Sequence, residues 1–170
     1  PYTTLFRYRA RENPLRVAYA EGEDQRVLRA VQIAVDDGLA KPILIGRRAV
    51  VQHRIERLGL RLKLGDNVGL IDPESDPAFD DYTRHYHQLM ERRGLEPDAA
   101  RTLVRTNTTV IAGLMVLRGD ADAMICGTIG QFDRHLRRVR EIVGLRRGVR
   151  KLSALQLLIQ PRYTLFLADT

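Results

Sequence analysis

The run RTNTTVIAGLMVLRGDADAMICGTIGQFDRHLR, residues 105–137, predicts a helix, a tight turn, a buried strand, a glycine-containing loop and a second helix. Thr106, Asn107 or Thr108 offers a side-chain oxygen that caps the first helix by accepting a hydrogen bond from a free backbone N–H. Apolar residues then recur at the spacing of a helix that buries one face, at Val110, Ile111, Leu114, Met115 and Leu117. Gly119 supplies the sharp turn that ends this helix.

A strand and a loop follow this first helix. Ala121–Cys126 is an apolar run of strand length, interrupted only by Asp122, and Gly127–Gly130 comes directly after it. Helical spacing resumes from Phe132 to Val143. In open α/β sheets, ligands bind at the carboxyl ends of the strands, where loops and helix N-termini converge. We therefore expect the functional site beside Gly127–Gly130.

The residues before this run alternate between strand and helix patterns. Strands are expected at 15–20, 43–45 and 68–73, and helices from the candidate N-cap Asp24 to Gly38 and over 48–58. This order and spacing predict right-handed crossovers and a parallel sheet. The predicted fold class is therefore α/β in three layers, with a mostly parallel sheet covered by helices on both faces.

Two further helices and a hairpin are expected. A helical region over 76–93 carries an apolar side of Tyr82, Tyr86, Leu89 and Met90, and a shorter helix runs from Pro97 towards Val104. Two apolar runs, 152–159 and 163–167, indicate a β-hairpin joined by Gln160-Pro161-Arg162.

The domain organisation follows from these patterns. We expect residues 1–13 to be a connector, 14–127 to form a first α/β subdomain and 128–170 to begin a second α/β subdomain. The chain starts without methionine and stops directly after a strand, so we expect it to be part of a longer protein in which the domain continues.

The composition indicates a globular protein. With 170 residues, 44% of them apolar, the chain is long enough to bury a core. No apolar run approaches membrane-spanning length and no signal-peptide pattern is present, so we expect a cytoplasmic protein without a membrane partner. Cys126 is the single cysteine, which excludes an intrachain disulfide.

The net charge of +7 implies a basic surface, and nearly all of the positive charge is arginine. Such a surface attracts nucleic acid or a metabolite that carries phosphate. Alternatively, the arginines are spread over solvated helix faces and have no common partner. They do not gather in one block interleaved with aromatic residues, so a nucleic-acid partner is not expected.

Several familiar site patterns are missing from the sequence. The loop after the first strand reads EGEDQR, which lacks the glycines of a dinucleotide-binding or phosphate-binding loop. His85 and His87 point to different sides of a helix, so we expect an exposed pair and no metal site. His53 and His135 are also expected at the surface, and Cys126 is expected to be a small buried apolar residue. No catalytic residue and no metal ligand is predicted.

What remains is a pattern suited to binding an anion. A helix N-terminus presents free N–H groups and a positive dipole end to phosphate, and two helices begin around the predicted strand. Each of these two helix starts, taken alone, fits ordinary helix capping and a tight turn better than it fits an anion site. Because both halves flank one strand, we predict a phosphate-binding site formed by Arg105, Thr108, Gly127, Thr128, Gly130, Arg134 and Arg137.

Several segments resemble the phosphate acetyl/butyryltransferase family. EGEDQRVLRA at 21–30 is similar to its opening signature, and RGDADAMICG at 118–127 to its second one. The chain is more similar still to the C-terminal phosphotransacetylase-like domain of large bacterial NADP-dependent malic enzymes, through RTNTT at 105–109, CGT at 126–128, FDRHL at 132–136 and LFLADT at 165–170. This resemblance covers nearly the whole chain. It implies a phosphotransacetylase-like fold of the isocitrate/isopropylmalate dehydrogenase type.

The resemblance also implies a function. In the malic-enzyme branch the domain binds acetyl-CoA at the predicted phosphate site, forms homo-oligomers and regulates the upstream domain, which converts malate to pyruvate and CO2 with NADP and Mg²⁺ or Mn²⁺. Active transferases of the family carry a Ser-Thr pair where Gln131 and Phe132 stand here. We therefore expect a regulatory domain without transferase activity. The alternative is an active phosphate acetyltransferase, since moving an acetyl group between CoA and phosphate needs mainly orientation and oxyanion stabilisation.

Overall fold

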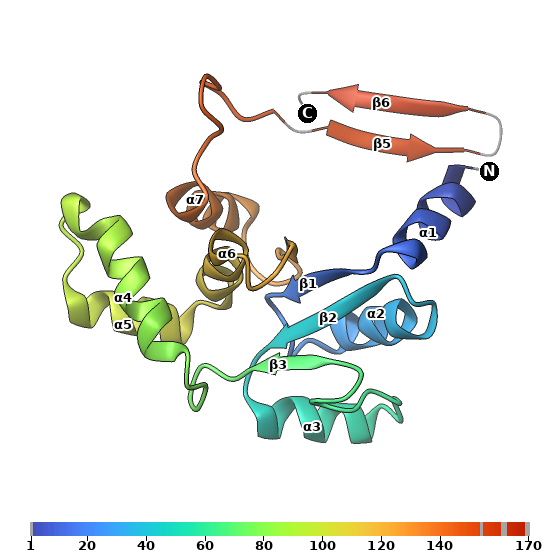
Figure 1. Cartoon of the computed structure of the whole chain (residues 1–170), viewed down its shortest axis with the longest axis horizontal. Coiled ribbons are helices and arrows are strands. Elements are labelled where there is room, and N and C mark those ends of the chain that lie inside the picture. Colours follow the sequence, from blue (N-terminus) through green and yellow to red (C-terminus); the bar gives the residue numbers. More distant parts are fainter. Residues whose placement is uncertain (1, 154, 161–162, 169–170) are drawn as a thin grey trace.

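Four parallel strands form the main sheet of the computed structural model, which describes residues 2–153, 155–160 and 163–168. Their order is β3-β2-β1-β4, with β1 at Leu15–Tyr19, β2 at Ala40–Ile45, β3 at Gly69–Ile71 and β4 at Ala123–Ile125 (Figure 1). The chain therefore proceeds outward from β1 to β3 and returns to the opposite side of β1 with β4. A reversal of this kind creates a crevice at the carboxyl ends of the strands.

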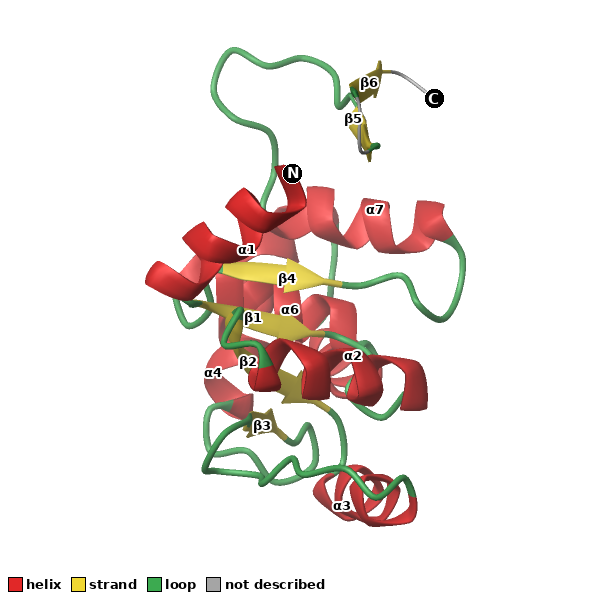
Figure 2. Ribbon diagram, turned by 90° about the vertical axis from the view of Figure 1, so that its right-hand side faces the viewer, coloured by secondary structure: helices red, strands yellow, loops and turns green. Residues whose placement is uncertain are grey.

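Helices cover both faces of this sheet, as the sequence predicts. One face is covered by α2 (Gln25–Asp36) and α3 (Arg48–Arg57), and the other by α4 (Phe79–Met90), α5 (Pro97–Thr106), α6 (Thr108–Arg118) and α7 (Phe132–Ile142). Alternate strand residues enter the two cores, so Tyr19 and Leu44 pack with α2 and α3, while Ala18 and Ile45 pack with α6. Figure 2 shows α2 and α6 on opposite sides of the strands.

Two helices have termini at predicted residues, for local reasons. Asp24 caps α2, because its carboxylate accepts a hydrogen bond from the backbone N–H of Arg26 at 2.7 Å. Of the three candidate caps for α6, Asn107 is the one observed, and its side chain accepts from Val110 N. Gly119 ends α6 with a φ of 78°, a left-handed conformation that glycine adopts without strain.

The strand predicted at 121–126 is shorter and more exposed than expected. β4 covers only Ala123–Ile125, and among the described strands it pairs with β1 alone. It is therefore an edge strand, and Ile125 is 49% exposed. Asp122, which precedes the strand, binds the Arg16 backbone and side chain. The prediction of a buried strand was wrong because one side of the sheet ends here.

Two other segments differ from the sequence prediction. Residues 2–12, described above as a connector, form helix α1 (Tyr2–Glu12), and its Arg7 and Arg11 both bind Asp37. Residues four apart lie on one side of a helix, which explains why both reach the same carboxylate. Leu89 of α4 is 36% exposed, because the buried side of that helix runs through residues 79, 82, 86 and 90. A short 3₁₀ helix, η1 (Glu91–Arg93), continues α4.

The predicted hairpin is present and stands apart from the main sheet (Figure 1). It consists of β5 (Leu155–Ile159) and β6 (Thr164–Ala168), which pair antiparallel, while Pro161 and Arg162 of its connection lie outside the described residues. The boundary placed between 127 and 128 stays a prediction, although Ile142 of α7 packs in the same core as α6. No described helix is both long enough and apolar enough to cross a membrane.

Candidate functional site: an arginine-lined cleft

A cleft of about 1060 Å³ opens at the carboxyl ends of β1, β2 and β3. The loop after β1, the N-terminal part of α3 and the loop after β3 form one wall. The junction of α5 with α6, the loop after β4 and the first turns of α7 form the other wall. This volume lies at the upper end of the range for small-molecule and cofactor sites.

The cleft brings together five of the seven residues predicted as an anion site, namely Arg105, Thr108, Gly130, Arg134 and Arg137. Gly127 and Thr128 do not line it. Instead, their backbones tie the loop after β4 to the loop after β1, since Gly127 N donates to Glu21 Oε1 at 2.9 Å. Thr128 O accepts from Arg26 Nη2 at 3.2 Å.

Three arginines of α5 and α7 contribute positive charge to the cleft. Arg105 stacks on the Phe79 ring, with 5.2 Å between the guanidinium carbon and the ring centroid. Arg134 and Arg137 stand on the first turns of α7. Within the described part of the chain, none of these three has a carboxylate oxygen within 4.0 Å. Their charge is therefore free to meet an anion.

Two helix N-termini also face the cleft. The first residues of α6, Thr108 and Thr109, line it, and Gln131, the N-cap of α7, lines it from the other side. Gln131 makes no side-chain capping bond in the described structure. The first N–H groups of α7 thus keep their hydrogen-bonding capacity, and the positive dipole ends of two helices add to the arginines.

Glu21, Thr109 and His135 form a cluster that the sequence did not predict, in which Thr109 and His135 are hydrogen-bonded and Glu21 lies close by. His135 was expected at the surface, but its side chain is only 16% exposed. Its Nδ1 lies 2.8 Å from Thr109 Oγ1, and its Nε2 lies 2.7 Å from the carbonyl oxygen of Ile129. Glu21 Oε1 is 4.0 Å from Nδ1. The prediction failed because α7 packs against α6, which turns His135 towards the cleft. The segment FDRHL, which contains His135, was the available signal.

Two of the four acidic residues that line the first wall, Glu23 and Asp24, form ion pairs with arginines. Arg47 binds the Glu23 carboxylate with Nε and Nη2, each at 2.9 Å, and its backbone N–H donates to the same carboxylate. These bonds hold the pKa of Glu23 below its ordinary value. Arg54 donates to the backbone oxygen of Glu23. Arg47 is thus paired within this wall, whereas Arg54 is hydrogen-bonded to a backbone oxygen and keeps its charge beside the cleft.

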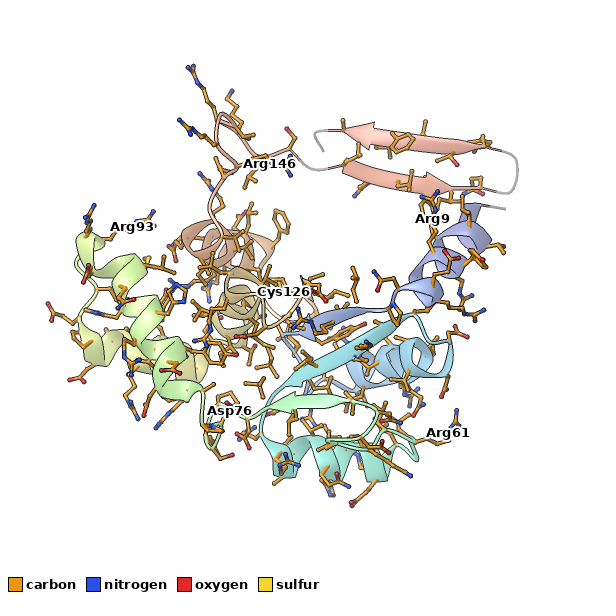
Figure 3. The ribbon with its side chains drawn as sticks, in the orientation of Figure 1. Arg9, Arg61, Asp76, Arg93, Cys126 and Arg146 are labelled. Atoms are coloured by element: carbon orange, nitrogen blue, oxygen red, sulfur yellow. The ribbon has the colours of Figure 1, made fainter. Side chains whose placement is uncertain are left out.

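Cys126 does not have the surroundings of a nucleophile. It follows β4, is half-buried, and lies near the middle of the molecule in Figure 3. Burial, with a smaller effect of the Glu21 charge, raises the pKa of its thiol. Within the described residues there is no group of three or more His, Cys, Asp or Glu side chains that could hold a metal ion.

The other arginines are distributed around the molecule. In Figure 3, Arg9, Arg61, Arg93 and Arg146 lie at the periphery, on four separate segments of the chain. Nucleic-acid binding ordinarily uses a continuous basic face interleaved with aromatic residues, and these four arginines do not form one. The cleft is where cations and helix N-termini converge.

The sequence of this chain is similar to a known protein family and to bacterial malic enzymes. The model of the family "Phosphate acetyl/butaryl transferase" matches residues 3–170. The chain is 52% identical over 155 residues to an NAD-dependent malic enzyme of Rhizobium meliloti (strain 1021), which covers 91% of the chain and 20% of the relative. It is 47% identical over 161 residues to an NADP-dependent malic enzyme of Escherichia coli (strain K12), which covers 95% of the chain and 21% of the relative.

A solved structure shows the same fold. The EutD phosphotransacetylase from Staphylococcus aureus has a TM-score of 0.83 to this chain at 20% identity, over 96% of this chain and 48% of that one. The predicted phosphotransacetylase-like fold is thereby confirmed. The chain spans about a fifth of the length of the curated relatives that it matches.

Proposed function

Because this chain belongs to the phosphate acetyl/butaryl transferase family, we propose that it is an acetyl-CoA-binding domain that regulates a malic enzyme of which it forms a part. The chain corresponds to the phosphotransacetylase-like segment of malic enzymes. We further propose that the ligand of this segment is acetyl-CoA, that its binding regulates the malic enzyme, and that the segment itself has no transferase activity.

The observation that carries the proposal is the charge of the cleft. Arg105, Arg134 and Arg137 have no carboxylate partner in the described structure, and two helix N-termini face the same space. Acetyl-CoA carries a diphosphate and a further phosphate on the ribose, so it offers several anionic groups to such a cleft. The volume of about 1060 Å³ is large enough for an elongated nucleotide thioester.

Gln131 and Phe132 are the basis for proposing binding without transfer. They occupy the start of α7, where the family's active transferases carry a Ser-Thr pair. Gln131 lines the cleft, while the Phe132 side chain is 71% exposed. An amide and a phenyl ring replace the two hydroxyls that would hold phosphate or the acetyl carbonyl there. The arginines of the cleft provide affinity for the anion, while this support for the reaction is absent.

Regulation follows from differential binding. Acetyl-CoA shifts an equilibrium between two arrangements of a homo-oligomer only by as much as it binds one of them better. In this proposal the malate-oxidising site, with Mg²⁺ or Mn²⁺, lies in another part of the same polypeptide, and the cleft acts on it through the quaternary arrangement. We propose NADP as its nucleotide, although the two malic-enzyme relatives are named for NAD and for NADP.

The second candidate function is an active phosphate acetyltransferase. The family description favours it, and so does the N-terminus of α7, whose N-cap Gln131 lines the cleft, because free N–H groups at a helix start can stabilise a developing oxyanion. Arsenate-dependent loss of acetyl-CoA measures this activity directly, since arsenate replaces phosphate and the acyl arsenate hydrolyses.

The decisive experiment follows malate-dependent NADP reduction by the complete polypeptide during titration with acetyl-CoA. We expect the activity to fall as acetyl-CoA rises. Activity that is indifferent to acetyl-CoA would reject acetyl-CoA as the effector. Absence of malate oxidation, together with arsenate-dependent loss of acetyl-CoA, would reject the regulatory proposal in favour of the transferase.

A further inference from the structure

We propose that His135 is a positioning residue of the anion cleft and that its protonation makes the affinity for acetyl-CoA rise as the pH falls. This inference rests on the proposed function, because it assigns a pH dependence to the same cleft. Its basis is the contact of one imidazole ring with Thr109, Ile129 and Glu21, which come from three different elements that wall the cleft.

The partners of the ring fix its tautomer. A carbonyl oxygen only accepts hydrogen bonds, so the 2.7 Å contact with Ile129 O requires a proton on Nε2. In the neutral ring Nδ1 then carries the lone pair, and it accepts from the Thr109 hydroxyl at 2.8 Å. Thr109 is 2% exposed, so this bond is protected from water. The ring therefore fastens the loop before α7 to the first turn of α6.

The loop fits closely against the ring. Gly130 adopts a φ of 103°, and a Cβ at this position would lie 3.1 Å from His135 Nε2. His135 thus determines where the backbone of Gly130 and the N-cap Gln131 lie, and both line the cleft. A residue that acts in this way positions the anion-binding groups of the cleft.

Glu21 supplies the electrostatic part of the inference. Its side chain is 8% exposed and its Oε1 lies 4.0 Å from Nδ1, so a buried negative charge sits beside a cleft that binds anions. Histidine is the side chain that ordinarily changes charge between pH 5 and 8. A proton gained at Nδ1 compensates Glu21, while Nε2 keeps its proton and its bond to Ile129. The loop therefore stays in place as the cleft becomes more positive.

The other polar and charged groups near the ring do not account for the expected pH dependence of acetyl-CoA binding. α6 presents Thr109, which does not ionise in this range. The thiol of Cys126 at the end of β4 has a pKa raised by burial and by Glu21, so it stays neutral. On α7 itself, Arg134 keeps its charge at every pH considered, as does Arg138, which binds Glu141 at 2.8 Å.

The test compares His135→Gln with the unaltered chain. Glutamine retains an N–H donor for Ile129 but gains no proton, and the exposed His53→Gln on α3 is the matched control. Calorimetric titration with acetyl-CoA at pH 5.5, 6.5, 7.5 and 8.0 gives the dissociation constants. Because the ligand's own phosphates titrate identically in every comparison, the ratio of the two chains isolates the protein's contribution.

We expect affinity to rise between pH 8.0 and 5.5 about five-fold more in the unaltered chain than in His135→Gln, the order of magnitude for one added unit charge near a phosphate in a solvated cleft. His53→Gln should follow the unaltered chain. Equal pH profiles of the unaltered chain and His135→Gln, with acetyl-CoA bound by both, would overturn this inference and leave the proposed function intact. Absence of acetyl-CoA binding by the unaltered chain at all four pH values would overturn the proposed function and this inference with it.

A second variant covers the case in which His135→Gln does not fold. Glu21→Gln keeps an oxygen that accepts from Gly127 N but removes the charge that the proton compensates. We expect it to bind acetyl-CoA about five-fold more tightly at pH 8.0, for the same electrostatic reason. Unchanged affinity of Glu21→Gln would contradict the role given to this carboxylate and overturn the inference.

Discussion

Replacing Gly22 with alanine tests how rigidly the loop after β1 is held against β2. Gly22 N donates to Ile45 O at 3.1 Å, so the two backbones are in direct contact. A Cβ at Gly22 would lie 2.8 Å from both N and O of Ile45 and 2.9 Å from Cβ of Leu44. All three atoms belong to the backbone or its first side-chain carbon, which rotamer changes do not move.

The magnitude follows from these contacts. Overpacking a well-packed site ordinarily costs about 1–3 kcal/mol, and three contacts with atoms that cannot rotate away put Gly22→Ala at the upper end, about 3 kcal/mol. For a chain of this size each kcal/mol lowers the melting temperature by about 2–4 °C, so we expect a decrease of about 6–12 °C.

The assay is thermal unfolding followed by circular dichroism, with Gly113→Ala as the matched control. A Cβ at Gly113 would lie 3.2 Å from Cδ1 of Ile142, the end of a flexible side chain. Alanine also favours the helix over glycine by about 1 kcal/mol, so Gly113→Ala should stay within about 1 kcal/mol of the unaltered chain. Unfolding of Gly22→Ala within about 2 °C of the unaltered chain, or an equal decrease in both variants, would refute the reasoning.

Three further predictions concern the cleft and its surroundings. Arg134→Ala should weaken acetyl-CoA binding about five-fold by calorimetry without altering the circular dichroism spectrum, whereas Arg140→Ala, on the same helix but outside the cleft, should change it less than about two-fold. The hydrogen bonds and charge of Arg16 hold the pKa of Asp122 at about 2, below its ordinary 3.8, so this carboxylate stabilises the fold above pH 4 and that contribution disappears as the pH falls towards 2. Asp122→Asn should therefore lose less stability than the unaltered chain between pH 4 and 2 in urea titrations, and an equal loss would contradict the assignment. Because the pKa of the Cys126 thiol is raised, iodoacetamide should alkylate it at pH 8 more slowly than it alkylates glutathione. A rate equal to or above that of glutathione would contradict the raised pKa.

Features that depend on neighbouring residues were predictable from the sequence. The cap Asp24, the cap Asn107 and the turn at Gly119 act within a few residues of their own position, and all three are observed. The parallel sheet was also predictable, because alternating strand and helix patterns at short spacing permit few other arrangements. Five of the seven predicted site residues converge for the same reason, since the carboxyl ends of parallel strands share one edge.

Features that depend on distant residues were not predictable in the same way. An apolar run such as Ala121–Cys126 looks the same whether the strand has one neighbour or two, so the edge position of β4 was hidden. Thr109 and His135 are 26 residues apart, on different helices, and spacing within α7 indicates only which residues share a face of that helix. The helical character of residues 2–12 was masked because Leu5, Phe6 and Tyr8 are exposed, so the segment has no buried apolar face with helical spacing.

The arginines of the cleft and the absence of the two hydroxyls have a common physical explanation in the proposed function. A regulatory ligand must persist for as long as the state that it stabilises, and a cleft that consumed acetyl-CoA would erase its own signal. Binding depends on the total charge of the cleft, to which Arg105, Arg134 and Arg137 each contribute. Transfer depends in addition on groups placed at the reacting carbonyl, and this requirement is much stricter in position. In the proposed function, Gln131 and Phe132 in place of two such groups reduce turnover far more than affinity, which is the combination that a sensor needs.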